Sequence, residues 1–507
     1  MAGPDRRRRP VALAGENRRQ FPPGEVARLS STPRPAPSQP EAAALPGASP
    51  QGRPPAGWKS LLALLSLSLS VLIWFNGLAQ SLQRPSVGDA LSLRQLELTA
   101  LAAEAAGPWA EPGLFGGDPR ADLAKALRRQ GEAAAVPVPA AQRLELALLE
   151  RGGAPEAVAA RLRELEGMVD APRRPLLEAL NSGRSLDPAL QAALLEPWKP
   201  SPFLAQLVCE QLGSDVSACP AARSGGRLLL QWAVVTLLPL PLLLIGVALL
   251  LRQLWFAFRG RLNAAPPLSG PPLDLVDVTL LIAGGFVLIG EVLLPQLLQG
   301  PLVAFLAALA LPLALEQGVQ VLLLYALLMS APLALLVAML AGRGLPPAGG
   351  WLQWHWHPPA SALARAATAV LMVLPVVALC GWLIERLWPE AGGSNPLLDL
   401  VLTNPDPRAM ACFALTATVL APLFEETLFR GVLLPVLARR LGPLPAVLAS
   451  GAVFALAHLS LTELVPLLVL GVGLGWLRWR TGRLAASVLM HSLWNGLTFL
   501  NLLVLAR

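Results

Sequence analysis

The sequence contains few charged residues. Asp, Glu, Lys and Arg make up only 14% of the 507 residues, whereas a soluble globular chain carries about 25%. Hydrophobic residues make up 54%, and the mean hydropathy is +0.54. Several apolar runs exceed the roughly 20 residues that a helix needs to cross a bilayer. This composition excludes a soluble enzyme and indicates an integral membrane protein.

The positive charge of the chain is confined largely to its N-terminal tail. A net charge of +7 suggests a nucleic-acid partner, but residues 1–59 alone hold ten basic and four acidic residues. This tail is rich in Pro, Ala and Arg and has no periodic apolar pattern, so we expect it to be disordered. We interpret it as a cytoplasmic topology signal rather than an arm for anionic lipid or nucleic acid. We therefore predict no nucleic-acid partner.

The first hydrophobic span runs from about residue 60 to residue 79. Gly77-Leu78-Ala79 offers small residues at which a signal peptidase could cut. The 59-residue leader and the 20-residue apolar run fit an uncleaved signal anchor, residues 60–80, better than a cleavable signal peptide. With either outcome, the segment that follows lies outside the cytoplasm.

Residues 81–225 differ in kind, since they carry 18 acidic and 15 basic residues. Apolar residues recur there at helical spacing, and Pro and Gly divide the region into short helices. The helical stretches are 91–106, 120–132, 141–168 and 188–197. We predict a soluble helical domain outside the cytoplasm, without a catalytic constellation. Cys209 and Cys219 could pair there, but two cysteines leave the disulfide open.

The remainder of the chain is predicted to lie in the membrane, as membrane helices in 226–400 and a catalytic core in 401–507. The candidate spans are 228–251, 276–298, 319–341, 362–386, 408–437, 443–459, 462–479 and 484–505. With the first span they give an all-α polytopic bundle of about nine transmembrane helices. Arginines follow every second span, which places the N-terminus in the cytoplasm. We interpret 302–315 as a re-entrant or interfacial piece, because a full crossing would invert all later loops.

Ionisable residues inside a bilayer are costly and usually functional. Of the four histidines, His355 and His357 lie in a Trp-rich loop that suits the membrane interface better than a metal site. His458 and His491 fall inside predicted spans, as does the pair Glu425-Glu426. Membrane proteins do use structural polar networks between helices. In a chain so poor in histidine, this concentration favours a functional site.

The spacing of these residues indicates how they face one another. Glu426 and Arg430 are at i, i+4, the spacing of a pair on one helix face. Glu425 lies about 100° around the axis and is free to point elsewhere. The same spacing relates Phe454 to His458 and His491 to Asn495. The depths along the helices are compatible with one shared layer, so three helices can bring a carboxylate, two imidazoles and an amide together.

These three motifs, Glu-Glu-x-x-x-Arg, Phe-x-x-x-His and His-x-x-x-Asn, stand in this order on successive spans. In this respect the chain resembles the CPBP family, which comprises type II CAAX prenyl endopeptidases and bacteriocin-processing or immunity proteases, also called the Abi family. The resemblance covers roughly residues 405–505. Neither the N-terminal tail nor the 81–225 domain takes part in it.

The resemblance implies an intramembrane glutamic endopeptidase. Glu425 matches the glutamate that acts as general base on a water, and His458 matches the histidine that helps to hold that water. His491 and Asn495 match the pair that stabilises the oxyanion. The supporting positions of the motifs are Glu426, Arg430 and Phe454.

Several alternatives stay open. Two histidines and a carboxylate can bind zinc, but the chain lacks His-Glu-x-x-His and an amide is an uncommon zinc ligand, so we expect no metal or other cofactor. A non-proteolytic scaffold that binds partners through 81–225 has no need of all four polar residues. A transporter lacks support from any visible inverted repeat. The expected partners are a membrane protein or peptide substrate and the lipid bilayer, in a bacterial plasma or internal membrane.

Overall fold

The computed structural model describes residues 57–83, 87–107, 113–133, 138–150, 155–213, 217, 219–388, 396–404 and 406–506. Nearly all of the N-terminal tail, with its predicted disorder, lies outside the described residues. Within the described ranges every regular element is helical, and no strand forms. The prediction of an all-α chain is thus confirmed.

In the described part of the chain, seven helices are long and apolar enough to cross a membrane. They are α1 (Gly57–Ser81), α9 to α10 (Pro220–Phe258), α11 to α12 (Leu275–Ala308), α13 (Leu313–Leu340), α14 (Pro359–Leu387), α16 to α18 (Pro407–Leu441) and α21 (Leu484–Ala506). The polytopic helical bundle is therefore confirmed. The count of nine stays a prediction, because it needs two shorter helices, α19 (Pro443–Ala457) and α20 (Leu464–Thr481). At 1.5 Å per residue, the 15 residues of α19 span only about 23 Å.

The structure differs from the sequence prediction at residues 302–315. Helix α12 (Leu294–Ala308) continues α11 (Leu275–Thr279) and the π-helical segment η7 (Leu280–Leu293) without a break, and the chain turns before α13 begins at Leu313. Residues 302–308 are therefore the end of a long helix and not a separate piece. Pro301 lies inside α12, and such an interior proline is tolerated in membrane helices because neighbouring groups satisfy the freed backbone.

A helical domain follows α1. Its elements are α2 (Val87–Ala106), α3 (Pro119–Ala133), α4 (Ala140–Leu149), α5 (Pro155–Met168), η3 (Ala171–Arg173), α6 (Arg174–Ser182), α7 (Pro188–Leu195), η4 (Glu196–Trp198) and α8 (Pro202–Leu212). These helices share a hydrophobic core in which Leu123, Leu144, Leu176 and Phe203 are fully buried. The stretch 141–168, predicted as one helical region, forms two helices, α4 and α5.

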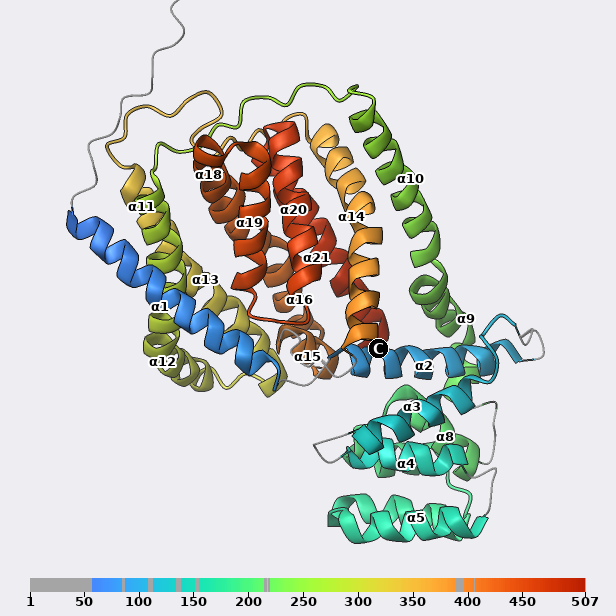
Figure 1. Ribbon diagram of the computed structural model, residues 1–507. Helices are drawn as coiled ribbons and strands as arrows, with labels where there is room; N and C mark the ends of the chain where they lie inside the picture. The colour runs from blue at the N-terminus through green and yellow to red at the C-terminus, as the bar shows by residue number, and fades with distance from the viewer. Residues whose placement is uncertain are drawn as a thin grey trace, which may run out of the picture. The chain divides into compact units, whose positions relative to one another are not determined.

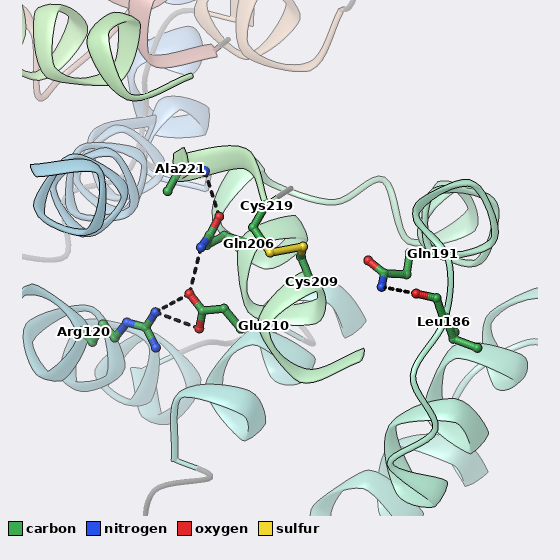
Figure 2. The surroundings of a disulfide bond; sticks show 8 residues. All are labelled: Arg120, Leu186, Gln191, Gln206, Cys209, Glu210, Cys219 and Ala221. Carbon is green, nitrogen blue, oxygen red and sulfur yellow. Dashed lines mark hydrogen bonds and ion pairs between the residues drawn. A yellow bond between two sulfur atoms is a disulfide. The ribbon is translucent and has the colours of Figure 1, made fainter. Parts of the chain in front are cut away.

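The disulfide that the sequence left open is formed between Cys209 and Cys219, and it ties the end of α8 to the start of α9 (Figure 2). Gln206 joins the same two helices, because its amide nitrogen donates to Glu210 and its amide oxygen accepts from the backbone nitrogen of Ala221. Glu210 also pairs with Arg120 of α3 over 2.7 Å. The disulfide and the Gln206–Ala221 contact thus fix α8 to the long α9–α10 helix, and the Arg120–Glu210 pair joins α3 to α8 within the domain.

The C-terminal helices pack closely, and α19 and α20 lie side by side (Figure 1). Gly451 of α19 faces Gly471 of α20, and a Cβ at position 471 would lie 3.0 Å from the Cα atom of Gly451. Only a residue without a side chain permits this approach, as at many helix interfaces in membranes. It leaves the carbonyl of Gly471 within reach of Arg430.

Arginines near one end of the bundle hold two loops by their backbone carbonyls. The donors and acceptors are Arg343 to Pro272, Arg439 to Pro271 and Leu273, Arg478 to Ser269, Arg480 to Asn263, and Arg483 to His355 and Pro358. The ends of α13, α18 and α20 therefore lie at the same face as these loops. These are among the arginines on which the sequence argument for a common cytoplasmic side depends.

Candidate active site

The paired glutamates lie where a long helix changes its hydrogen-bonding pattern. Glu425 and Glu426 end α17 (Ala421–Glu426), with a π-helical segment on either side, η8 (Thr416–Leu420) and η9 (Thr427–Leu433). π-Helical turns occur mostly as single insertions and are frequent at functional sites. The two carboxylates consequently project from a helix that is irregular both before and after them.

Glu426 is fully buried, and it holds two other members of the site. Its Oε1 atom accepts a hydrogen bond from Nη1 of Arg430 at 2.8 Å and lies 3.0 Å from Nδ1 of His491. Arg430 is equally buried and donates through Nη2 to the carbonyl of Gly471 at 2.9 Å. A buried ion pair needs such additional hydrogen bonds to offset the cost of desolvation. Oε1 of Glu426 is thus shared by Arg430 and His491, while its Oε2 atom has no hydrogen-bond partner among the described residues.

Glu425 points toward the two intramembrane histidines. Its Oε2 atom lies 4.0 Å from Nε2 of His458 and 4.0 Å from Nε2 of His491. This oxygen is buried and has no hydrogen-bond partner within the described part of the chain. One carboxylate oxygen and two imidazole nitrogens therefore face a common point, at separations that a single water can bridge.

The partners of the two histidines indicate which ring nitrogen carries hydrogen. Nδ1 of His458 lies 2.8 Å from the carbonyl oxygen of Phe454, and a carbonyl can only accept. Nδ1 of His491 faces the Glu426 carboxylate in the same way. With Nδ1 as the donor, Nε2 of each neutral ring presents a lone pair toward Glu425. Either Nε2 atom can donate only when its ring is protonated.

Phe454 is the aromatic centre of the cluster. Its ring centroid lies 4.7 Å from that of His458 and 5.7 Å from that of His491. The guanidinium carbon of Arg430 lies 4.3 Å from the same ring centroid, within the range of a cation–π contact. The buried ring fixes the two imidazoles and the guanidinium relative to one another.

Asn495 has a different partner. Its amide nitrogen donates to the carbonyl of Ala417, in η8, at 2.8 Å. An amide nitrogen has two hydrogens, so this contact leaves the second one for another acceptor. The structure therefore brings Glu425, Glu426, Arg430, Phe454, His458 and His491 into one contact network. It ties Asn495 to η8, in the same long helix that carries Glu425.

Two polar residues that reach this cluster were not predicted from the sequence. Tyr325 of α13 donates its hydroxyl to Oε1 of Glu425 at 3.3 Å. Glu291, in η7, interacts electrostatically with both Glu425 and Tyr325, and it accepts a hydrogen bond from the indole nitrogen of Trp74, in α1, at 3.5 Å. Glu291 is an ionisable residue inside a predicted span, so the reasoning applied to Glu425 would have found it.

The histidines of the Trp-rich loop lie elsewhere. Trp354 and Trp356 stack with ring centroids 5.8 Å apart, and Nε2 of His355 lies 2.7 Å from the side-chain oxygen of Gln353. Among the described residues, no three His, Cys, Asp or Glu side chains are grouped closely enough to hold a metal ion. The chemistry of the donors at the Glu425 cluster is nevertheless that of a two-histidine, one-carboxylate zinc site, with each Nδ1 hydrogen-bonded as in such sites. A zinc ion lies about 2.0–2.2 Å from each of its ligand atoms. Zinc ligation would therefore require Oε2 of Glu425 and the two Nε2 atoms, which are 4.0 Å from it, to move closer together.

Comparison with known proteins matches two parts of the chain to family models. Residues 407–497 match the family model of the type II CAAX prenyl endopeptidase Rce1-like proteins. Residues 88–230 match a family model described only as a domain of unknown function. No curated protein matches the chain significantly, and no solved structure does. The first match begins at the start of α16 and includes all the residues of the cluster from Glu425 to Asn495. Residues 407–497 therefore form a domain of the Rce1-like type II CAAX prenyl endopeptidase family.

Proposed function

We propose that this protein is an intramembrane endopeptidase that hydrolyses a peptide bond of a membrane-associated protein or peptide, with Glu425 activating the attacking water. The observation that carries the proposal is the position of Oε2 of Glu425. This atom is buried, has no hydrogen-bond partner among the described residues and lies 4.0 Å from two imidazole nitrogens. A general base must lie within hydrogen-bond reach of the proton that it takes, directly or through one water.

The reaction follows from this geometry. Glu425 takes a proton from a water that is also held by Nε2 of His458, and the resulting hydroxide attacks the scissile carbonyl carbon. The carbonyl oxygen gains the negative charge as the tetrahedral intermediate forms. Glu425 then transfers its proton to the leaving nitrogen as the carbon–nitrogen bond breaks. No proton or electron is left over in this sequence.

Two groups are assigned to the developing oxyanion. Asn495 offers the amide hydrogen that does not bind Ala417. His491 offers Nε2–H when its ring is protonated, and its Nδ1 atom is held 3.0 Å from the Glu426 carboxylate. Donors aimed at the charge that develops in the transition state commonly contribute about 10²–10³ to the rate each.

We assign the N-terminus and the arginine-rich loops to the cytoplasm and the helical domain to the opposite side, in a bacterial plasma or internal membrane. Two observations support this assignment. The loop-holding arginines gather at one face of the bundle, as the positive-inside rule requires. The Cys209–Cys219 disulfide, at the end of the helical domain, is typical of an oxidising compartment.

The test compares native membranes that contain the wild type, Glu425→Gln or Glu385→Gln by mass spectrometry of peptide termini. Glu385 is exposed on α14 and provides the same chemical change away from the cluster. Termini present with the wild type and the control, but absent with Glu425→Gln, support the proposal and name the substrate. Identical termini in all three samples would favour a non-proteolytic scaffold.

A further inference from the structure

The helical domain contains a cavity of about 560 Å³. It is lined by residues of α2, η3 and α4, by the segment that joins η4 to α8, and by Leu402 of α15 (Pro396–Thr403). Its most buried polar side chains are Glu97, Glu145 and Trp198. The family match of this domain assigns it no ligand, and the proposed proteolysis does not use it.

Glu145 lines this cavity and carries an unpaired acceptor. Its residue is only 2% exposed, and its Oε1 atom has no hydrogen-bond partner in the described part of the chain. The other oxygen, Oε2, accepts a long hydrogen bond of 3.4 Å from the hydroxyl of Ser201. Buried carboxylate oxygens are almost always paired, so an unpaired one that lines a cavity indicates a ligand group.

Trp198 presents an unpaired donor to the same cavity. The residue is 3% exposed, and its indole nitrogen has no hydrogen-bond partner within the ranges that the structure describes. The indole nitrogen can only donate, and it usually finds an acceptor when it is buried. The cavity thus offers one unused acceptor and one unused donor.

The charged residues of the cavity wall indicate whether a ligand group beside Glu145 is a cation or an anion. Glu97 is 7% exposed and pairs with Arg94 at 3.0 Å, so this arginine of the lining is already engaged. Burial raises the pKa of Glu145 well above its usual value, and the charge of Glu97 raises it further. A cation beside Glu145 would stabilise its ionised form. The other basic residues of the lining lie toward solvent, because Lys199 is exposed and Arg173 pairs with Asp170.

We propose that this cavity is a binding site for a basic side chain carried on a peptide. The ammonium or guanidinium group pairs with Oε1 of Glu145, and the indole nitrogen of Trp198 donates to a neighbouring peptide carbonyl. A peptide supplies both groups at once, whereas a free amine supplies only the cation.

Calorimetric titration of the full-length protein in lipid nanodiscs tests the proposal with three probes. N-acetyl-lysinamide carries the cation and the carbonyls, n-butylammonium carries only the cation, and N-acetyl-norleucinamide has the apolar side chain without charge. We expect N-acetyl-lysinamide to bind at least about tenfold more tightly than either of the others. Equal binding of n-butylammonium would overturn the assignment to a peptide. Absence of N-acetyl-lysinamide binding would overturn the site itself.

Two variants test the named atoms. Glu145→Gln should weaken N-acetyl-lysinamide binding by about tenfold or more, since it removes a charged hydrogen-bond acceptor. Glu164→Gln, on the exposed side of α5, is the matched control and should leave the affinity unchanged. Trp198→Phe should weaken N-acetyl-lysinamide binding without affecting n-butylammonium. Unchanged affinity in folded Glu145→Gln or Trp198→Phe protein, verified by circular dichroism, would contradict the assignment. Because the readout is binding, its failure leaves the proposed proteolysis untouched.

Discussion

The hydroxyl of Tyr325, the only tyrosine of the chain, donates a hydrogen bond over 3.3 Å to Oε1 of Glu425. This contact holds one oxygen of the carboxylate while the other faces the two histidines. Tyr325 is therefore a positioning residue in the proposed mechanism. It connects α13, which lies outside the matched region 407–497, to the proposed general base.

Tyr325→Phe should lower kcat by about tenfold or more while the protein remains folded. A hydrogen bond to a charged group contributes about 1.5–3 kcal/mol, and its loss lets the carboxylate rotate away from the water. Ser330→Ala removes a hydroxyl from the exposed side of the same helix and serves as the control. Equal kcat for Tyr325→Phe and the wild type would remove Tyr325 from the mechanism.

Glu426→Gln should destabilise the protein by about 3–5 kcal/mol, because it leaves the fully buried guanidinium of Arg430 without its counter-charge. The double variant Glu426→Gln, Arg430→Met should recover part of this loss. The neighbouring Glu425→Gln is the matched control and should unfold close to the wild type. Unfolding in increasing SDS measures all four proteins. A Glu426→Gln protein that is inactive but fully stable would contradict the supporting role of Glu426.

Metal chelation separates the metal-free mechanism from its zinc-dependent alternative, since both use the same three side chains. We expect cleavage by the purified enzyme to continue unchanged after treatment with 1,10-phenanthroline. Elemental analysis should then find much less than one zinc ion per active chain. Loss of activity on chelation, with recovery on addition of zinc, would establish the alternative.

The helical domain should become more stable as the pH falls from 7 toward 5. Burial raises the pKa of Glu104 to about 7 from the ordinary 4.5, although Arg120 opposes the shift. The folded state consequently binds a proton that the unfolded state releases in this range, so this stability is present below about pH 4.5 and is lost as the pH rises through 7. Thermal unfolding between pH 5 and 8 should show a weaker pH dependence for Glu104→Gln than for the wild type. An equally steep dependence in both proteins would assign the effect to other groups.

The part of the site that could be predicted from the sequence consists of contacts within single helices. The pairs Glu426–Arg430 and Phe454–His458 follow from residues four apart on one helix, and both contacts are present. Long apolar runs likewise predicted the membrane helices. The Gly471 carbonyl that binds Arg430 has no such signal, because it depends on the close approach of two helices.

The features that were missed depend on which helices become neighbours. Tyr325 and Glu291 reach the cluster from α13 and η7, and nothing in their local sequence indicates those neighbours. The contact of Asn495 with Ala417 depends on a π-helical segment, which apolar periodicity does not reveal. The end of α12 also differs from the prediction. Pro301 interrupts the apolar run in the sequence, but the helix continues through it to Ala308.

The most direct test of the central claim measures cleavage by purified protein in liposomes, with a peptide that spans the scissile bond found in native membranes. We predict that Glu425→Gln lowers the rate by about a thousandfold or more, since an amide cannot take a proton from water. Glu385→Gln should cleave at the wild-type rate. Cleavage by folded Glu425→Gln within tenfold of the wild type would contradict the assignment of Glu425 as the general base.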